Sequence, residues 1–206
     1  MKPPSLILAS ASPRRAELLR QLGLAFQVVP SDAAEVCHSH FTPREVCLMN
    51  AYRKARTVAD RFPAALVLGA DTIVCLDNTI FGKPADLTEA NRMLVQLQGR
   101  THQVITGVCL VRQQARRSRL FAVVTDVTFH SLSPARIQDY LAAINPLDKA
   151  GAYAIQEQGE QIVAGISGSF SNVVGLPLER LKEALAAMAG GSEVARTRKR
   201  DGRVSG

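Results

Sequence analysis

The longest apolar stretch of the chain, AALVLGADTIVCL from Ala64 to Leu76, limits what the chain can fold into. It is too short to span a bilayer and it contains Asp71, so no segment is predicted to cross a membrane. Its content of Val, Ile and Leu is typical of a buried central strand, here with a bend at Gly69. A buried carboxylate needs a metal, a cation or several hydrogen-bond donors. Asp71 is therefore either a functional acid or a structural aspartate held by backbone N–H groups, and this segment alone favours neither.

Strand-like and helical segments alternate along the 206 residues, which predicts an α/β fold. Apolar runs and alternating patterns predict strands over residues 5–10, 25–32, 65–77, 103–112 and 120–132. Capping residues, early prolines and closing glycines predict helices over residues 13–23, 42–62, 87–100, 133–144 and 177–189. The predicted caps are Ser12, Ser133 and Thr42, the last in a capping box with Glu45, and DNTI, residues 77–80, is predicted to be a turn. The polar link QQARRS predicts a β-hairpin, and AYAIQ, QIVAGIS and FSNVVGL are predicted to be short extended pieces.

The composition separates one domain, residues 1–189, from a basic tail, residues 190–206. The tail has five basic and two acidic residues and almost no large apolar ones, so we expect it to be a disordered, solvated extension. Three of the seven net positive charges lie in the tail, and the mildly basic body suits a small anionic substrate. The chain has no Trp and few aromatic side chains, which disfavours nucleic acid as a partner.

The cysteines favour a reduced, cytoplasmic protein. Cys37, Cys47, Cys75 and Cys109 form no C-x-x-C pair, and a chain of this size does not need disulfides to fold. The N-terminal apolar run LILASA is too short for a secretory signal. The sequence CHSH, residues 37–40, lacks a second cluster that would complete a tetrahedral site, so zinc is not expected there.

The stretch SASPRR, residues 10–15, places two arginines in the first turn of a predicted helix. A helix N-terminus presents unpaired N–H groups and a partial positive charge, so arginines normally avoid it and anions bind there. Arg14 and Arg15 point about 100° apart on a helix. They could hold two parts of a polyphosphate, or one could bind phosphate while the other pairs with a carboxylate. A solvated helix start is the alternative.

Other segments carry candidate ligands for an anion or a base. Lys83 lies in the constrained turn FGKPAD and Lys54 in the long helix, although each lysine taken singly is typical of a surface residue. In KAGAYAIQ, small residues allow close backbone approach, and the amide of Gln156 could read a base edge. The glycine-rich segment ISGSFSNVVGLPL, residues 166–178, indicates either a loop over a pocket or a tight connection. No P-loop, dinucleotide-binding glycine motif or nucleophile elbow occurs in the chain.

Five segments occur together in one order: LILASASPRRAELLRQLG, LGADTIVCLD, GKPAD, KAGAYAIQ and GSFSNVVGLPL. In this order and spacing they resemble the Maf family of nucleoside triphosphate pyrophosphatases, first described as septum-formation inhibitors. The resemblance runs from about Ile7 to Leu185. It implies an elongated mixed sheet flanked by helices, with two lobes and a central cleft, related to the inosine triphosphatase fold. It also implies hydrolysis of a nucleoside triphosphate to the monophosphate and pyrophosphate with Mg²⁺ or Mn²⁺.

The resemblance assigns roles residue by residue. The catalytic acid, as proton acceptor, falls on Asp71, which with Glu35 is also a candidate metal ligand. The phosphate-binding motif falls on Ser10, Arg14 and Arg15, and the active-site lysines fall on Lys54 and Lys83. The specificity positions fall on Arg14, Thr72 and Gln156.

One departure concerns the metal. The family usually has two adjacent acids after the second strand, whereas this chain has SDAAEV, so only Glu35 matches and Ala34 replaces its neighbour. Asp32 is a candidate substitute. The departure bears on metal affinity more than on the type of reaction.

The motifs GADT and KAGAYAIQ resemble the dTTP/UTP pyrophosphatase branch, whose amide at Gln156 could pair with N3–H and a carbonyl of thymine or uracil. Two alternatives stay open. The first is a pyrophosphatase for another nucleotide, such as 7-methyl-GTP or a modified base. The second is a non-catalytic, nucleotide-binding regulator of septum formation. The resemblance also makes a homodimer plausible.

Overall fold

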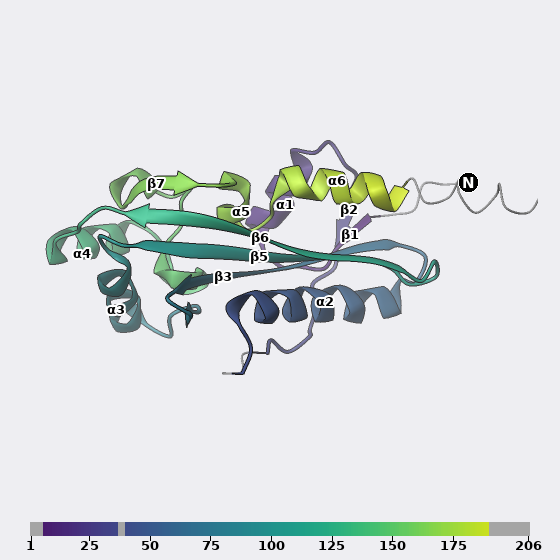
Figure 1. The fold of residues 1–206 in the computed structure, drawn as a ribbon, viewed down its shortest axis with the longest axis horizontal. Helices are drawn as coiled ribbons and strands as arrows, with labels where there is room; N and C mark the ends of the chain where they lie inside the picture. The colour runs from purple at the N-terminus through teal and green to yellow at the C-terminus, as the bar shows by residue number, and fades with distance from the viewer. Residues whose placement is uncertain (1–5, 37–39, 190–206) are drawn as a thin grey trace, which may run out of the picture.

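The computed structural model describes residues 6–36 and 40–189, and one mixed sheet organises them (Figure 1). Its strands are β1 (Leu6–Leu8), β2 (Phe26–Val28), β3 (Leu66–Leu76), β4 (Thr79–Phe81), β5 (Thr101–Arg112), β6 (Arg117–Phe129) and β7 (Val163–Ser167). The strand order is β2-β1-β3-β5-β6-β7, with β4 also paired to β3. β1 runs parallel to β2 and β3, and the other pairings are antiparallel. The predicted α/β class and elongated mixed sheet are confirmed.

Helices cover both faces of this sheet (Figure 1). They are α1 (Pro13–Arg20), α2 (Pro43–Arg61), α3 (Leu87–Leu97), α4 (Pro134–Ala143), α5 (Phe170–Val174) and α6 (Leu178–Ala189). Three short 3₁₀ turns follow α4: η1 (Pro146–Asp148), η2 (Ala150–Ala152) and η3 (Gly159–Gln161). In Figure 1, α2 lies below the sheet, α1, α5 and α6 lie above it, and α3 and α4 lie at its left-hand end. Among the described helices, none has the length and apolar content needed to cross a bilayer.

Two glycines bring α2 into direct contact with the sheet. A Cβ on Gly69 of β3 would lie 2.4 Å from the carbonyl oxygen of Ala51, and one on Gly107 of β5 would lie 2.5 Å from that of Cys47. Both carbonyls belong to α2, so only glycine allows the helix to pack this closely. The predicted bend at Gly69 is wrong: the pairing of β3 with β5 continues through Gly69 opposite Cys109. This glycine serves helix packing.

Local signals for helix starts and turns are confirmed. The side chains of Ser12, Thr42 and Ser133 cap α1, α2 and α4, and Thr42 with Glu45 forms the expected capping box. β5 and β6 form the predicted hairpin. Asp77 and Asn78 have φ angles of 48° and 69°, and they turn the chain from β3 back into β4.

Two predicted extended pieces are wrong. AYAIQ begins in η2 at Ala152 and ends in a turn at Ile155 and Gln156. FSNVVGL contains the helix α5, because Ser169 accepts a hydrogen bond from the backbone N–H of Asn172 and Gly175 closes the turn at a φ of 122°. These end signals outweigh the strand preference of the two valines. QIVAGIS contributes β7, as predicted. The basic tail and residues 37–39 of CHSH lie outside the described residues.

Candidate active site

A cleft of about 600 Å³ opens along one edge of β3. Among the described strands, β1 pairs with β3 only as far as Leu68, and β4 begins to pair at Val74. The edge between these two positions borders the cleft, beyond the carboxyl end of the parallel strand β1, where α/β sheets commonly bind ligands. Every candidate site residue lines this cleft: Ser10, Arg14, Arg15, Glu35, Lys54, Asp71, Thr72, Lys83 and Gln156. The structure therefore brings together all the positions to which the resemblance assigns a role.

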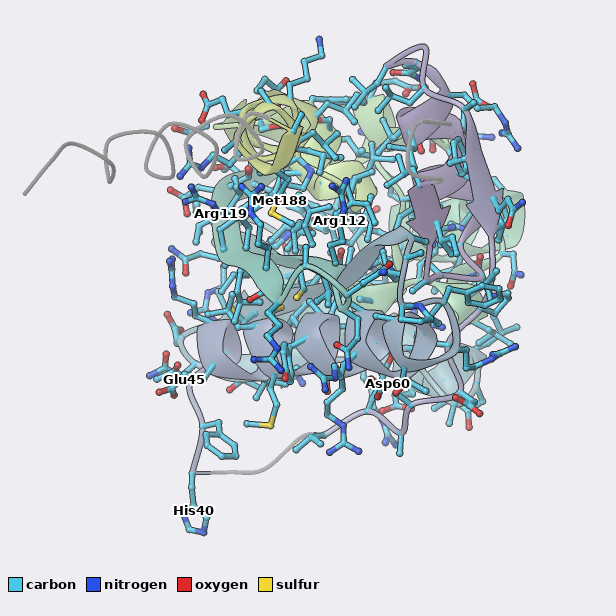
Figure 2. All side chains as sticks on the ribbon, turned by 90° about the vertical axis from the view of Figure 1, so that its right-hand side faces the viewer. His40, Glu45, Asp60, Arg112, Arg119 and Met188 are labelled. Atoms are coloured by element: carbon cyan, nitrogen blue, oxygen red, sulfur yellow. The ribbon has the colours of Figure 1, made fainter. Side chains whose placement is uncertain are left out.

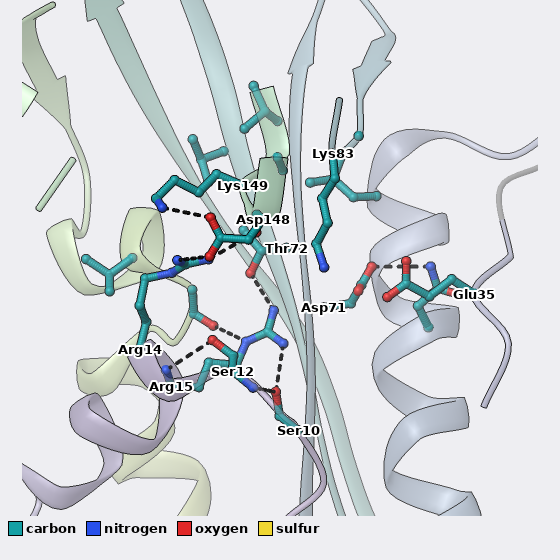
Figure 3. A pocket seen from close by; sticks show the side chains of 18 of the residues that line it. Ser10, Ser12, Arg14, Arg15, Glu35, Asp71, Thr72, Lys83, Asp148 and Lys149 are labelled. Atoms are coloured by element: carbon teal, nitrogen blue, oxygen red, sulfur yellow. Dashed lines mark hydrogen bonds and ion pairs between the residues drawn. The ribbon is translucent and has the colours of Figure 1, made fainter. Parts of the chain in front are cut away.

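Asp71 and Thr72 are neighbours in β3, so their side chains point to opposite faces of the sheet (Figure 3). Asp71 is 6% exposed and faces α2. Its Oδ1 accepts a hydrogen bond from Nζ of Lys54 at 2.6 Å, and its Oδ2 accepts one from the amide of Asn50 at 3.2 Å. Side chains of α2 therefore hold both oxygens of the carboxylate. The close approach of α2 at Gly69 and Gly107 makes these contacts possible.

The Lys54 ammonium joins Asp71 to a second carboxylate. Its Nζ lies 2.6 Å from Oε1 of Glu35 as well as 2.6 Å from Asp71. Partial burial raises the pKa of Glu35, but the hydrogen bond and charge of Lys54, with the charge of Lys83, outweigh burial, so the net pKa is below its ordinary value. The amide of Asn50 also pairs with both backbone groups of Val36 and so fixes the segment that carries Glu35.

The carboxylate missing at Ala34 is not replaced. Asp32 is exposed and does not line the cleft, so it does not stand in for the absent acid. Among the described residues, no three His, Cys, Asp or Glu side chains gather as a metal site. Asp71 and Glu35 nevertheless converge on one cationic position, Nζ of Lys54. One or two carboxylates completed by substrate phosphates are the donors that Mg²⁺ uses, so these residues fit a Mg²⁺ or Mn²⁺ ion delivered with a nucleotide.

Arg15 forms the opposite wall and is held by neutral oxygens. Its Nε donates to the carbonyl of Gly175 at 2.9 Å, and its terminal nitrogens donate to Oγ1 of Thr72 at 2.9 Å and to Oγ of Ser10 at 3.2 Å. Burial lowers the pKa of Arg15, and the nearby charge of Asp71 opposes that shift. A guanidinium has five N–H groups, so two of them are left for a ligand.

Arg14 pairs with a carboxylate, which is one of the roles that the sequence allowed for one of the two arginines. Its guanidinium donates to Oδ2 of Asp148 at 3.1 Å (Figure 3). The second oxygen of Asp148 accepts from Nζ of Lys149 at 2.8 Å, and that lysine also lies 3.2 Å from Glu157. The Lys149 side chain is only 4% exposed. Sequence reasoning missed both residues: Asp148 lies just before the KAGAYAIQ motif, and Lys149 is its first residue.

Two further residues that sequence reasoning missed, Tyr140 and His102, hold KAGAYAIQ in place. The hydroxyl of Tyr140, on α4, accepts from the backbone N–H of Ala154 and donates to its carbonyl, both at 3.1 Å. The hydroxyl of Tyr153 lies 2.8 Å from Nε2 of His102. Both tyrosines and the histidine are buried, so these contacts fix the backbone just before Gln156. Tyr140 lies in a predicted helix, and nothing in its local sequence indicated this partner.

Lys83 and Gln156 are exposed at the cleft. Within the described residues, neither side chain forms a hydrogen bond or an ion pair, so both are ready to meet a ligand. Lys83 follows β4, and its turn is tied to the opposite segment by the N–H of Gly151, which donates to the carbonyl of Gly82 at 3.0 Å. In Figure 3, Lys83 extends toward Asp71. Two lysines and an arginine therefore surround the two acids.

A mixed sheet with several cationic side chains in a cleft at the end of its parallel strand defines an α/β protein whose cleft suits a polyanion. The chain belongs to the Maf family: the Maf-like protein family matches residues 5–188.

Similar proteins cover nearly the same span. The chain is 48% identical over 181 residues to a protein of Gloeobacter violaceus, covering 88% of this chain and 94% of the relative. It is 49% identical over 180 residues to one of Symbiobacterium thermophilum, covering 87% and 92%. Both relatives are named dTTP/UTP pyrophosphatase. The solved structure of the Staphylococcus aureus Ham1 protein has the same fold, with a TM-score of 0.53 at 14% identity, covering 89% of this chain and 99% of that one.

Proposed function

We propose that this protein hydrolyses dTTP and UTP to the nucleoside monophosphate and pyrophosphate. The names of the relatives described above support this substrate class. The observation that carries the proposal is the position of Asp71. It is a buried acid held by Lys54 and Asn50, and it faces a cleft whose other wall carries Arg14, Arg15 and the N-terminus of α1.

The cationic groups of the cleft would bind the triphosphate. Arg15 keeps two N–H groups for phosphate oxygens, and Lys83 has a free ammonium among the described residues. The N-terminus of α1 adds backbone N–H groups and a partial positive charge. Arg14 would exchange its contact with the exposed carboxylate of Asp148 for a contact with phosphate. The cost of two arginines at a helix start is thus offset by the bound anion.

In the reaction, water attacks the α-phosphorus and Asp71 accepts a proton from it. The bond between the α-phosphorus and the oxygen bridging to the β-phosphorus breaks, and pyrophosphate leaves. Lys54 and Asn50 orient the carboxylate, while Arg15 and Lys83 stabilise the charge that moves onto pyrophosphate. A divalent cation held by Asp71 and Glu35 would, when bound, neutralise phosphate charge and orient the substrate.

We expect Gln156 to select the base. The exposed amide of Gln156 can donate to a carbonyl and accept the N3–H of thymine or uracil. The hydroxyl of Thr72 is already shared between Arg15 and Thr106, so Thr72 would act by holding Arg15. Adenine and cytosine carry an unprotonated ring nitrogen in place of this N–H, so Gln156 would match them less well.

The test is pyrophosphate release from a panel of dTTP, UTP, CTP, GTP and 7-methyl-GTP, with Mg²⁺, with Mn²⁺ and with a chelator. We expect turnover of dTTP and UTP with metal, and loss of turnover in Asp71→Asn. Asp139→Asn, an exposed acid of α4 outside the cleft, is the matched control and should retain wild-type turnover. Binding of nucleotide without turnover would favour the regulator instead, and preference for 7-methyl-GTP would favour the other substrate class.

A homodimer and a cytoplasmic location remain part of the proposal. The thiols of Cys47, Cys75 and Cys109 are free and buried, which suits a reducing compartment. Sedimentation of the full chain would test the dimer, and fractionation of the producing cells would test the compartment.

A further inference from the structure

A second pocket, of about 350 Å³, lies at the tip of the β5–β6 hairpin, against α2. Figure 2 looks onto this end of the molecule, where Arg112 lies between α2 and α6. Four arginines line the pocket, and no acidic residue is among its described lining residues. They come from α2, from both strands of the hairpin and from the turn between the strands: Arg56, Arg112, Arg117 and Arg116. The pocket therefore concentrates positive charge in a concave surface away from the cleft.

Two of these arginines already have hydrogen-bond or ion-pair partners in the folded chain. Nε of Arg56 lies 3.1 Å from the carboxylate of Asp60, and Arg117 donates to the carbonyls of Ala187 and Met188 at the end of α6. Arg112 and Arg116 differ from them. Within residues 6–36 and 40–189, neither side chain forms an ion pair or a hydrogen bond, and Nε of Arg112 is buried without a partner. A buried donor without an acceptor destabilises the folded chain, and an anion in the pocket would supply the missing acceptor.

The frame around these arginines is built before any ligand arrives. The hairpin loop is tied to the end of α2 by the N–H of Gln114, which donates to the carbonyl of Pro63 at 2.8 Å. The amide of Gln113 donates to Asp60 at 2.9 Å, and the turn closes through Arg116 at a φ of 50°. Because the loop and helix are already joined, little ordering is left to oppose binding.

We propose that this pocket binds a small phosphate-bearing anion at a site separate from the cleft. Guanidinium groups match phosphate oxygens in geometry and charge, and several of them converge here. The volume is larger than one phosphate needs, so the pocket accommodates a diphosphate or a phosphomonoester. The exposed ring of Tyr52 would contact the organic part of a phosphomonoester. The inference does not depend on the proposed function of the cleft.

The test is calorimetric titration of the full chain with inorganic pyrophosphate in the presence of a chelator. The pocket is disabled in Arg112→Gln/Arg116→Gln. The matched control is Arg92→Gln/Arg136→Gln, which removes two exposed arginines of α3 and α4 and the same net charge. We expect the control to bind as the wild type does. The pocket variant should lose one class of site or at least about tenfold in affinity, the size of one lost charge-assisted hydrogen bond.

An isotherm of the pocket variant that superimposes on the wild-type isotherm would overturn the proposal. Equal losses in the control and the pocket variant would also overturn it, because they would indicate unspecific charge attraction. If the double variant fails to fold, Arg116→Gln alone gives the same comparison, since Arg116 is exposed. Hydrolysis of dTTP should survive in the pocket variant. If the wild-type chain does not hydrolyse dTTP, the proposed function is contradicted. The comparison of pyrophosphate binding between the pocket variant and the control still tests the proposed pocket.

Discussion

The ammonium of Lys54 lies 2.6 Å from Oδ1 of Asp71, and the two side chains are only 14% and 8% exposed. The lysine comes from the middle of α2 and the acid from the middle of β3, so their contact depends on how closely the helix sits on the sheet. A buried carboxylate without a partner is costly, and Lys54 supplies the charge that allows Asp71 to remain in the core.

Replacing Lys54 with Gln should abolish turnover and destabilise the fold. The variant leaves Asp71 buried without its counter-ion and close to Glu35, which should lower the free energy of unfolding by about 3 kcal/mol. Urea unfolding measures the loss. Lys83→Gln is the matched control, because Lys83 is exposed at the same cleft; it should lose turnover at wild-type stability. Wild-type stability in Lys54→Gln would contradict the counter-ion role.

Adding a methyl group at Gly69 should move Lys54 away from Asp71. In Gly69→Ala the new Cβ meets the backbone of α2 at Ala51 and Ala55, so the helix has to move and stability should fall by about 3 kcal/mol. Turnover should fall too, because Lys54 moves with α2. Gly165→Ala of β7, where a Cβ meets no atom within 4 Å, is the control and should change stability by less than about 0.5 kcal/mol. Similar thermal unfolding of the two variants would show that α2 tolerates the added group.

Removing one hydroxyl should alter substrate binding from a distance. Tyr140→Phe leaves both backbone groups of Ala154 without their buried partner, at a cost of about 1–3 kcal/mol. The segment before Gln156 then loosens, so KM for dTTP should rise more than kcat falls, and the preference for dTTP over CTP should narrow. Steady-state kinetics with both nucleotides measure this split. Tyr52→Phe, outside the cleft, is the control and should leave both constants unchanged. If Tyr140→Phe lowers kcat by the same factor for both nucleotides and leaves KM unchanged, Tyr140 has a purely structural role.

His102 should make the fold sensitive to acid. Burial lowers its pKa to about 4 from an ordinary 6.5. A group with a depressed pKa in the folded chain takes up its proton first in the unfolded chain, so stability falls as pH drops from about 6.5 toward 4. Between pH 6.5 and about pH 5 the loss should be about 2 kcal/mol. Denaturant unfolding across this range should show the slope in the wild type and a shallower one in His102→Gln. Equal slopes would mean that other groups carry the acid sensitivity.

Much of the architecture could be predicted because its signals are local. The caps Ser12, Thr42 and Ser133 and the turn at Asp77 depend on neighbouring residues, and each lies where the sequence predicts. The helix α5 was missed because its end signals, Ser169 and Gly175, compete with a strand-like composition within one short segment.

The residue types of the site, and their presence in one cleft, followed from the motifs and from the resemblance they carry. The pairings did not follow. Which acid meets Lys54, that Arg14 meets Asp148 while Arg15 meets Thr72, and that Tyr140 holds Ala154 are contacts between segments far apart in the chain.

The sequence by itself determined the periodicity of each element, its ends, and which chemical groups the chain offers. Only the tertiary structure decided which groups face one another. The alternation of side chains along β3 places Asp71 and Thr72 on opposite faces, and the glycines of β3 and β5 set how near α2 lies. Such distances arise from packing of whole elements, and no short stretch of residues contains them.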